Sequence, residues 1–227
     1  MQFARQGDEL RLRWKRDGET QPEEEAWTRW ATTDWPGDIV LVPALPDRLV
    51  VVKPDEEFRL LQGARARLLV LVPLWLEVRT RDEAESAVVQ IPTAVMSDTW
   101  WGTLEEGELG YWLPTRGRRK LSDADFQEHL CICPLQLENR SGEDLRVDKI
   151  ALRMAHLSLY RQHQRFWSDV TRVRYLGEDT GSRLDIEGRP PAEAADAELL
   201  TEPRVELERG FTARTFARLR SSFGGWR

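Results

Sequence analysis

The sequence predicts an all-β protein built from two β-sandwich-like (immunoglobulin-like) layers or domains. Leu10, Leu12 and Trp14 alternate with basic residues, and a period of two is typical of half-buried strands. Short Val-rich runs, such as residues 39–45, end at prolines and indicate buried strands. Turn residues at 139–142 separate two further alternating segments, as in a sandwich hairpin.

The same patterns place each element along the chain. In the first half we expect strands over residues 10–15, 26–33, 39–45, 49–52, 68–78 and 87–91, followed by a hairpin of residues 99–102 and 109–113. In the second half we expect strands over residues 129–138, 145–154, 157–160, 170–176, 183–186 and 205–207. Helical segments are expected over residues 123–128, 190–200 and the C-terminal tail.

A basic, Gly-containing linker near residues 116–121 indicates the boundary between two halves. We therefore predict an N-terminal β domain over residues 1–118 and a sandwich-like domain over residues 119–208. Residues 209–227 form a basic tail with five arginines and no acid. The whole chain has a net charge of −6, so the tail leaves −11 for the rest. An acidic body argues against broad nucleic-acid binding, which needs many phosphate contacts.

The location is predicted from what the apolar segments and cysteines permit. The longest apolar run covers residues 68–76, whereas a spanning helix needs about 20 residues. Residues 1–12 carry charges where a signal peptide has its apolar core. Cys131 and Cys133 point the same way along one strand and are poorly placed for a disulfide. We expect a cytoplasmic protein that does not span the membrane.

Catalytic motifs are missing from the sequence. It has no nucleophile elbow, P-loop, dinucleotide fingerprint or HExxH motif, and only three histidines. We therefore expect no enzyme and no cofactor. Catalytic groups can lie far apart in the sequence and then form no local motif, so an enzyme stays the alternative.

One candidate metal site is the run from His129 to Cys133. On a strand, His129, Cys131 and Cys133 share a face and offer one imidazole and two thiolates. Ligands in a row spread over about 13 Å, so two of them would need a distant partner such as His156 or His163. The alternative is that both cysteines are small core residues.

A candidate ligand site lies on the aromatic hairpin. Its residues are Asp98, Trp100, Trp101, Glu108 and Tyr111. Aromatic rings beside carboxylates can form a cage for a cationic or carbohydrate-like ligand. The alternative is that cross-strand aromatic pairs hold the hairpin together.

The basic tail is a candidate partner-binding segment. Phe216, Leu219, Phe223 and Trp226 recur at helical spacing, with Arg214 and Arg218 beside the apolar stripe. A basic amphipathic helix can dock in a partner's groove or on an anionic membrane surface. The alternative is that the stripe packs on the chain's own acidic body.

Two hairpins carry a family resemblance. The motifs are SDTWWG at 97–102 with GELGY at 107–111, and CICPLQLENRS at 131–141; similar stretches are HLSLY at 156–160, Val50–Pro54 and Pro73–Trp75. Over residues 40–180 the chain resembles an uncharacterised bacterial and archaeal family of unknown function. The family often has one cysteine before the proline, so Cys131 is an addition here. The resemblance implies genes beside small mechanosensitive channels and an accessory role to a membrane protein.

Together these observations favour a non-catalytic binding or accessory protein. Its expected partner is another protein, such as a membrane channel, or a second copy of the chain. The alternative is an enzyme or a metal- or ligand-binding protein with a pocket near Trp100, Glu108 and Tyr111, or near His129 and Cys133.

Overall fold

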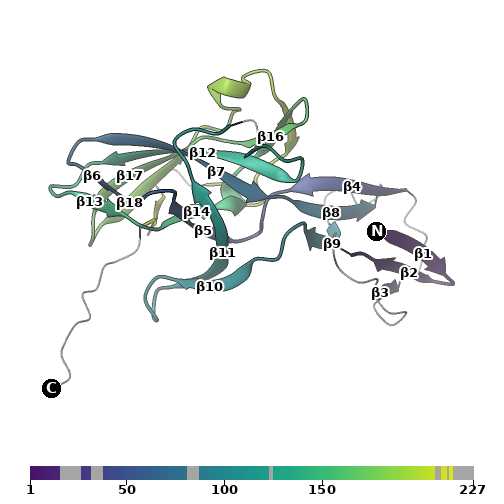
Figure 1. Cartoon of the computed structure of the whole chain (residues 1–227). Coiled ribbons are helices and arrows are strands. Elements are labelled where there is room, and N and C mark those ends of the chain that lie inside the picture. The colour runs from purple at the N-terminus through teal and green to yellow at the C-terminus, as the bar shows by residue number, and fades with distance from the viewer. Residues whose placement is uncertain are drawn as a thin grey trace. The chain divides into compact units, whose positions relative to one another are not determined.

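The computed structural model describes residues 1–15, 27–31, 38–80, 87–122, 125–207, 211–213 and 215–216 of the 227-residue chain (Figure 1). The chain divides into two compact units, one of residues 1–43 with 75–94 and one of residues 44–74 with 95–227. The sequence suggested a division near residue 118 instead. The contacts divide the chain elsewhere because a strand over residues 65–73 pairs along its whole length with a strand over residues 130–138.

The smaller unit consists of two three-stranded sheets, ordered β1-β2-β3 and β4-β8-β9. Its strands are β1 (Gln2–Gln6), β2 (Glu9–Arg13), β3 (Thr28–Ala31), β4 (Ile39–Ala44), β8 (Trp75–Thr80) and β9 (Ala87–Pro92). Leu12, Val78 and Ile91 are buried together in its core. The alternation that predicted a strand at residues 10–15 therefore corresponds to β2, in which Leu10 and Leu12 are buried.

The larger unit contains an eight-stranded sheet, a four-stranded sheet and a two-stranded ribbon. The large sheet holds β7 (Arg65–Pro73), β12 (Leu130–Asn139), β15 (Leu159–Gln162), β16 (Arg165–Ser168), β17 (Thr171–Gly177), β18 (Gly181–Ile186), β19 (Glu198–Thr201) and β20 (Thr212–Ala213). The four-stranded sheet holds β5 (Leu49–Pro54), β10 (Ser97–Trp101), β11 (Glu108–Gly117) and β14 (Ile150–Arg153), and the ribbon pairs β6 (Phe58–Leu60) with β13 (Leu145–Val147).

The main core of the larger unit lies between these sheets. Val50 and Val52 of β5 pack with Val70 of β7 and with Leu135 and Leu137 of β12, all at 1% exposure or less. The mostly β prediction is confirmed. The immunoglobulin-like arrangement is not confirmed. An immunoglobulin sandwich has two antiparallel sheets, whereas here β5 pairs with β11, and β12 pairs with β16 and β17, in parallel.

The central strand β12 passes from a part of the sheet that is covered on both faces to a part that is covered on one face. Its first half, residues 131–135, is buried on both faces, whereas in its second half Leu137 and Asn139 are buried and Gln136 and Glu138 are half-buried. A continuous apolar run is typical of a doubly covered strand, and alternation is typical of a strand with one open face. The change at Leu135 marks where the outer face of the large sheet becomes uncovered.

A one-residue bulge lies beside β12. Cys131 and Ile132 pair with Phe166 and Trp167, but Leu135 pairs with Thr171, so the partner chain has one extra residue between them. Pro134 lies opposite this bulge, where its missing N–H is tolerated. Such an extra residue shifts the alternation of the side chains that follow it.

Two helical predictions need correction. Of residues 190–200, only η4 (Ala192–Ala194) is helical, and Glu198–Thr201 form β19. The described tail residues are not helical: β20 pairs with β18, and Phe216 makes an isolated bridge with Ile150. The other helical positions among the described residues are η3 (Met154–His156) and Asp125, which lies within the segment predicted to be helical over residues 123–128.

Among the described residues, no helix is both long and apolar enough to cross a membrane.

Candidate functional site

The outer face of the large sheet has an apolar half and an arginine-rich half. In the apolar half, Leu71 and Ile132 pack with Tyr160 and Trp167, and Ala194 of η4 lies against them. Past Leu135 the described residues form no such cluster on the outer face, and arginines take the outward positions of β7 and β17.

Strand register brings these arginines together in two rows across the sheet. The first row is Arg67, Gln136, Arg172 and Asp185, and the second is Arg65, Glu138, Arg174 and Arg183. Residues that pair across strands point to the same face, so each row forms a continuous line of polar side chains. Arg67 and Arg172 thus flank the uncharged Gln136, and the Arg172 Nε atom donates a 3.3 Å hydrogen bond to the Gln136 amide oxygen.

Around these rows, seven arginines gather near four carboxylates. We call this set the arginine face; it consists of Arg65, Arg67, Arg140, Arg172, Arg174, Arg183 and Arg189 with Glu138, Asp185, Glu187 and Glu193. The excess of three positive charges contrasts with the net charge of −6 of the whole chain.

Two of the carboxylates, Glu138 and Glu187, lie beneath the arginines. Glu138 is bound by Arg65 at 2.8 Å and by Arg140 at 2.9 Å. Glu187 is bound by Arg172 at 2.6 Å and by Arg189 at 3.1 Å. The Glu138 and Glu187 side chains are only 14% and 12% exposed, whereas the arginines that bind them are 37–74% exposed. Guanidinium groups therefore form the outer layer of this surface.

The contacts to Glu138 and Glu193 favour the ionised forms of these two carboxyl groups. The hydrogen bond from Arg65 lowers the pKa of Glu138, and Arg140 lowers it further. The hydrogen bond from Arg67 likewise lowers the pKa of Glu193. Each guanidinium has five N–H donors, so one contact to a glutamate leaves donors for a second acceptor.

Two grooves cross the arginine face. One, of about 510 Å³, is lined by residues of β7, β12 and β17, and the other, of about 650 Å³, extends toward η4. Both are lined by Arg67, Gln136 and Arg172. Paired guanidinium groups in a groove are suited to bidentate binding of carboxylates or phosphates.

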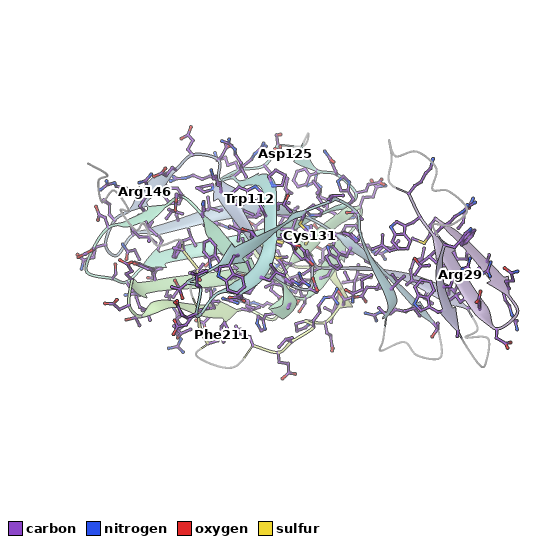
Figure 2. The ribbon with its side chains drawn as sticks, turned by 90° about the horizontal axis from the view of Figure 1, so that it is seen from below. Arg29, Trp112, Asp125, Cys131, Arg146 and Phe211 are labelled. Carbon is purple, nitrogen blue, oxygen red and sulfur yellow. The ribbon has the colours of Figure 1, made fainter. Side chains whose placement is uncertain are left out.

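The predicted metal residues do not form a ligand set. Cys131 and Cys133 are fully buried with their sulfur atoms 3.9 Å apart, whereas His129 is exposed and precedes β12. Burial raises the pKa of the Cys131 thiol well above its usual value. The part of the chain that the structure describes contains no group of three His, Cys, Asp or Glu placed to hold a metal. Figure 2 shows Cys131 among the side chains of the larger unit.

The aromatic hairpin places its predicted residues on two faces. Asp98, Trp100 and Tyr111 share one face of β10 and β11, and Trp101 and Glu108 share the other. The Tyr111 hydroxyl donates a 2.9 Å hydrogen bond to Asp47, and burial together with this bond raises the pKa of Tyr111 to about 12.

The other hairpin residues also have partners within the larger unit. Trp101 is buried beside Val51. Glu108 binds Arg153 at 2.7 Å, and Trp100 donates a hydrogen bond to the Thr103 carbonyl. A ligand at this hairpin stays a prediction.

Of the six predicted partner-binding residues of the tail, Phe216 is the one that the structure describes. Phe216 is 6% exposed and packs edge-to-face on Tyr175, with ring centres 5.6 Å apart. Its ring therefore belongs to the core of the larger unit rather than to a free helical stripe. Arg214, Arg218, Leu219, Phe223 and Trp226 lie outside the described residues.

Residues 1–220 match the family model described as protein of unknown function (DUF432). The chain belongs to this family. No curated protein and no solved structure matches the chain. The resemblance at the two hairpins thus extends over nearly the whole of this DUF432 chain, whereas the gene neighbourhood that it implies stays a prediction.

The arginine face of this DUF432 protein was missed in the sequence. Its signal is an Arg-x-Arg pattern that occurs in two strands, at residues 65–67 and 172–174. Alternation predicts that both arginines of each pair lie on one face. The pairing of both strands with β12 cannot be read from composition or local pattern.

Proposed function

We propose that this DUF432 protein is a non-catalytic binding protein that docks an acidic segment of a protein partner on its arginine face. The supporting observation is the position of Arg67 and Arg172 on either side of Gln136, in both grooves. Two guanidinium groups separated by an amide can bind successive carboxylates, while Gln136 can donate or accept a hydrogen bond between them.

A protein partner fits this surface better than a nucleic acid. The arginine face occupies half of one sheet face on a chain of net charge −6, and nucleic-acid affinity depends on many phosphate contacts over a larger surface. The sequence resemblance suggests a membrane channel as the partner, and a cytoplasmic location is part of the same proposal.

Binding of a labelled peptide of ten glutamates tests the proposal. Fluorescence anisotropy at about 0.15 M salt measures its affinity for the full chain and for Arg67→Glu/Arg172→Glu. We expect the reversal to weaken binding at least about tenfold. The neutral variant Arg67→Gln/Arg172→Gln should lose less affinity for the peptide than the charge-reversed variant. It keeps the proposal testable if the charge-reversed variant does not fold.

The matched control reverses two exposed arginines elsewhere, Arg29→Glu/Arg59→Glu, and changes the net charge equally. It should bind the peptide within about twofold of the unchanged chain, apart from long-range screening. If both charge-reversed variants lost the same affinity for the peptide, the loss would be explained by net charge alone, and the proposal would be contradicted. Tighter binding of a DNA duplex than of the acidic peptide would overturn the choice of a protein partner.

A further inference from the structure

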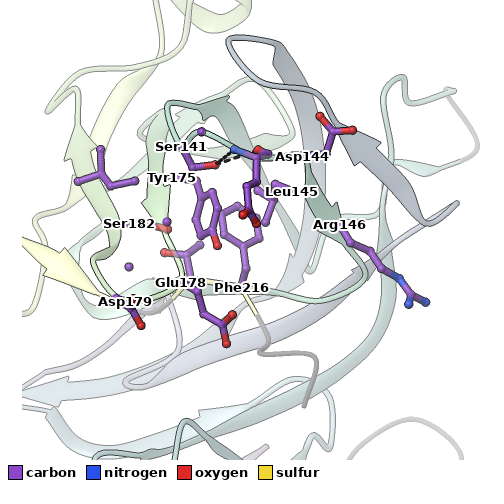
Figure 3. Close-up of a pocket in the computed structure, with 15 residues that line it drawn as sticks. Ser141, Asp144, Leu145, Arg146, Tyr175, Glu178, Asp179, Ser182 and Phe216 are labelled. Atoms are coloured by element: carbon purple, nitrogen blue, oxygen red, sulfur yellow. Dashed lines mark hydrogen bonds between the residues drawn. The ribbon is translucent and has the colours of Figure 1, made fainter. Parts of the chain in front are cut away.

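A separate cavity opens in the larger unit, between the loop after β12, the hairpin that joins β17 to β18, and the segment Thr215–Phe216 (Figure 3). Its volume is about 580 Å³, within the range of about 300–1,000 Å³ typical of ligand sites. It shares no lining residue with the two grooves of the arginine face. We call it the acidic pocket.

Four carboxylates give this pocket its charge. They belong to Glu143, Asp144, Glu178 and Asp179. Arg146 is the lone cationic side chain in the described lining; it is bound to Glu57 and points away from the cavity in Figure 3. The pocket is therefore electrostatically suited to a cation.

The loop that carries two of these carboxylates is held in place by Asn139. The Asn139 amide donates hydrogen bonds to the carbonyls of Leu60 at 2.8 Å and Glu143 at 2.7 Å. Its oxygen accepts bonds from the Ser141 N–H at 3.0 Å and the Ser141 hydroxyl at 2.7 Å. All of these groups belong to the larger unit, so this wall of the pocket is preorganised.

Two buried hydroxyls in the lining have no hydrogen-bond partner. Ser182 and Thr215 are each 1% exposed, and neither Ser182 Oγ nor Thr215 Oγ1 is bonded to any other atom of the described structure. Buried polar groups are rarely left unpaired, so each such group calls for an explanation. Donors of a ligand in the pocket would supply the missing bonds. This observation is independent of the acidic side chains.

Aromatic rings form another part of the wall. Tyr175 and Phe216 meet edge-to-face at an interplanar angle of 89°, and Figure 3 shows Glu178 beside the two rings. Ring faces beside carboxylates are suited to an organic cation that stacks and donates hydrogen bonds. A hard metal ion instead needs several oxygen ligands at about 2.0–2.6 Å, and the described residues contain no such ligand group.

We propose that the acidic pocket binds the guanidinium group of an arginine side chain in a basic polypeptide segment. A guanidinium donates up to five hydrogen bonds, which match carboxylate and hydroxyl acceptors, and its flat surface can stack on the Tyr175 or Phe216 ring. This site is separate from the arginine face and would take a ligand of the opposite charge.

Such an arginine has two sources. One is this chain itself, because the sequence after Phe216 contains Arg218, Arg220 and Arg227 and no acid. The other is a basic segment of another protein. A segment attached next to the pocket has an effective concentration of order millimolar, so it would compete with an added peptide.

The experiment uses a labelled peptide with the sequence of residues 217–227, titrated into full-length chains and followed by anisotropy. The chains are the unchanged protein, the tail variant Arg218→Gln/Arg220→Gln/Arg227→Gln, and the tail variant carrying Asp144→Asn/Glu178→Gln as well. The matched control adds Asp8→Asn/Glu202→Gln, two exposed acids elsewhere, to the tail variant.

We expect the peptide to bind the tail variant, and the pocket substitutions to weaken this binding at least about tenfold while the control pair changes it less than twofold. Thr215→Val added to the tail variant should weaken binding at least about fivefold without lowering the melting temperature. Valine is similar in size to threonine, so the substitution removes an unpaired hydroxyl and leaves the packing unchanged. A merely structural role of Thr215 would not produce that combination.

The same titrations separate the two sources. Binding to the tail variant at least tenfold tighter than to the unchanged chain identifies the chain's own tail, and equal binding identifies another protein's segment. Absence of binding to the tail variant overturns the proposal. Equal affinity for a peptide with lysine in place of each arginine, or binding that the pocket substitutions do not change, overturns it too.

Discussion

Asp169 is a fully buried carboxylate at the bulge beside β12, and its removal gives a sharp test of the fold. Its two oxygens accept hydrogen bonds from the Ser158 backbone N–H at 2.5 Å and from the Tyr160 hydroxyl at 3.0 Å. Replacement by alanine leaves both donors without this acceptor inside the protein. Replacement by asparagine keeps the shape and one acceptor oxygen for the Ser158 N–H.

The expected loss of unfolding free energy follows from the two lost hydrogen bonds. A buried donor left without its acceptor costs about 1–3 kcal/mol, so Asp169→Ala should lower the free energy of unfolding by about 2–5 kcal/mol. Asp169→Asn should cost about 1 kcal/mol or less, because its amide can donate to the Tyr160 oxygen. Urea unfolding at pH 7, followed by tryptophan fluorescence, measures both changes.

The pH dependence gives a second readout. Burial raises the pKa of Asp169 above its usual value, so the folded protein holds this proton more tightly than the unfolded chain. That stabilising contribution is complete below the unfolded pKa of about 3.9 and is lost as the pH rises through the folded pKa. Asp169→Asn should therefore gain stability relative to the unchanged protein as the pH rises from 4 to 7.

Two results would refute this reasoning about Asp169. One is an Asp169→Ala protein whose unfolding free energy lies within about 0.5 kcal/mol of the unchanged protein, which would place it among ordinary surface substitutions. The other is an Asp169→Asn protein with the same pH dependence as the unchanged chain.

Three further predictions concern the larger unit. Asn139→Ala should destabilise it by about 2–5 kcal/mol, since the side chain makes four hydrogen bonds, three of them buried; a urea midpoint equal to that of the unchanged chain would contradict this. Phe216→Ala should cost about 3–5 kcal/mol as a cavity in the main core, measured by thermal unfolding; a cost below about 1 kcal/mol would show that Phe216 packs loosely. Cys131 and Cys133 should resist iodoacetamide in the native protein and react after unfolding, because both thiols are buried and burial raises the pKa of Cys131; mass spectrometry that finds rapid native alkylation would refute this.

Strands were predictable from the sequence where the local pattern determines them. The run Cys131–Leu137 is apolar and ends in alternation, and it forms β12. Residues 190–200 begin with two prolines and contain alanine and glutamate, which favour a helix. Glu198–Thr201 instead pair with β15. Backbone pairing with an edge strand outweighed a weak local preference, and no local pattern reveals that partner.

The candidate sites were less predictable because they depend on pairing between distant strands. Trp100 and Trp101 stood out by residue type, yet Trp100 is bonded within its own hairpin and Trp101 is in an apolar cluster. Ser182 and Thr215 are ordinary residues in the sequence, and only the structure shows their buried, unpartnered hydroxyls. Residue type identifies chemistry that a side chain is capable of, whereas register decides what surrounds it.

The bulge at Asp169 links the interior of the large sheet to the arginine face. Phe166 pairs with Cys131 and Thr171 with Leu135, so both point toward the main core although they are five residues apart. In an unbroken strand, residues an odd number apart point to opposite faces. Without the extra residue, Arg172 would pair with Leu137 and point into the core. The hydrogen bonds that hold Asp169 therefore help to place Arg172 outward, beside Gln136, and a substitution that loosens them should weaken the acidic-peptide binding together with the stability of the sheet.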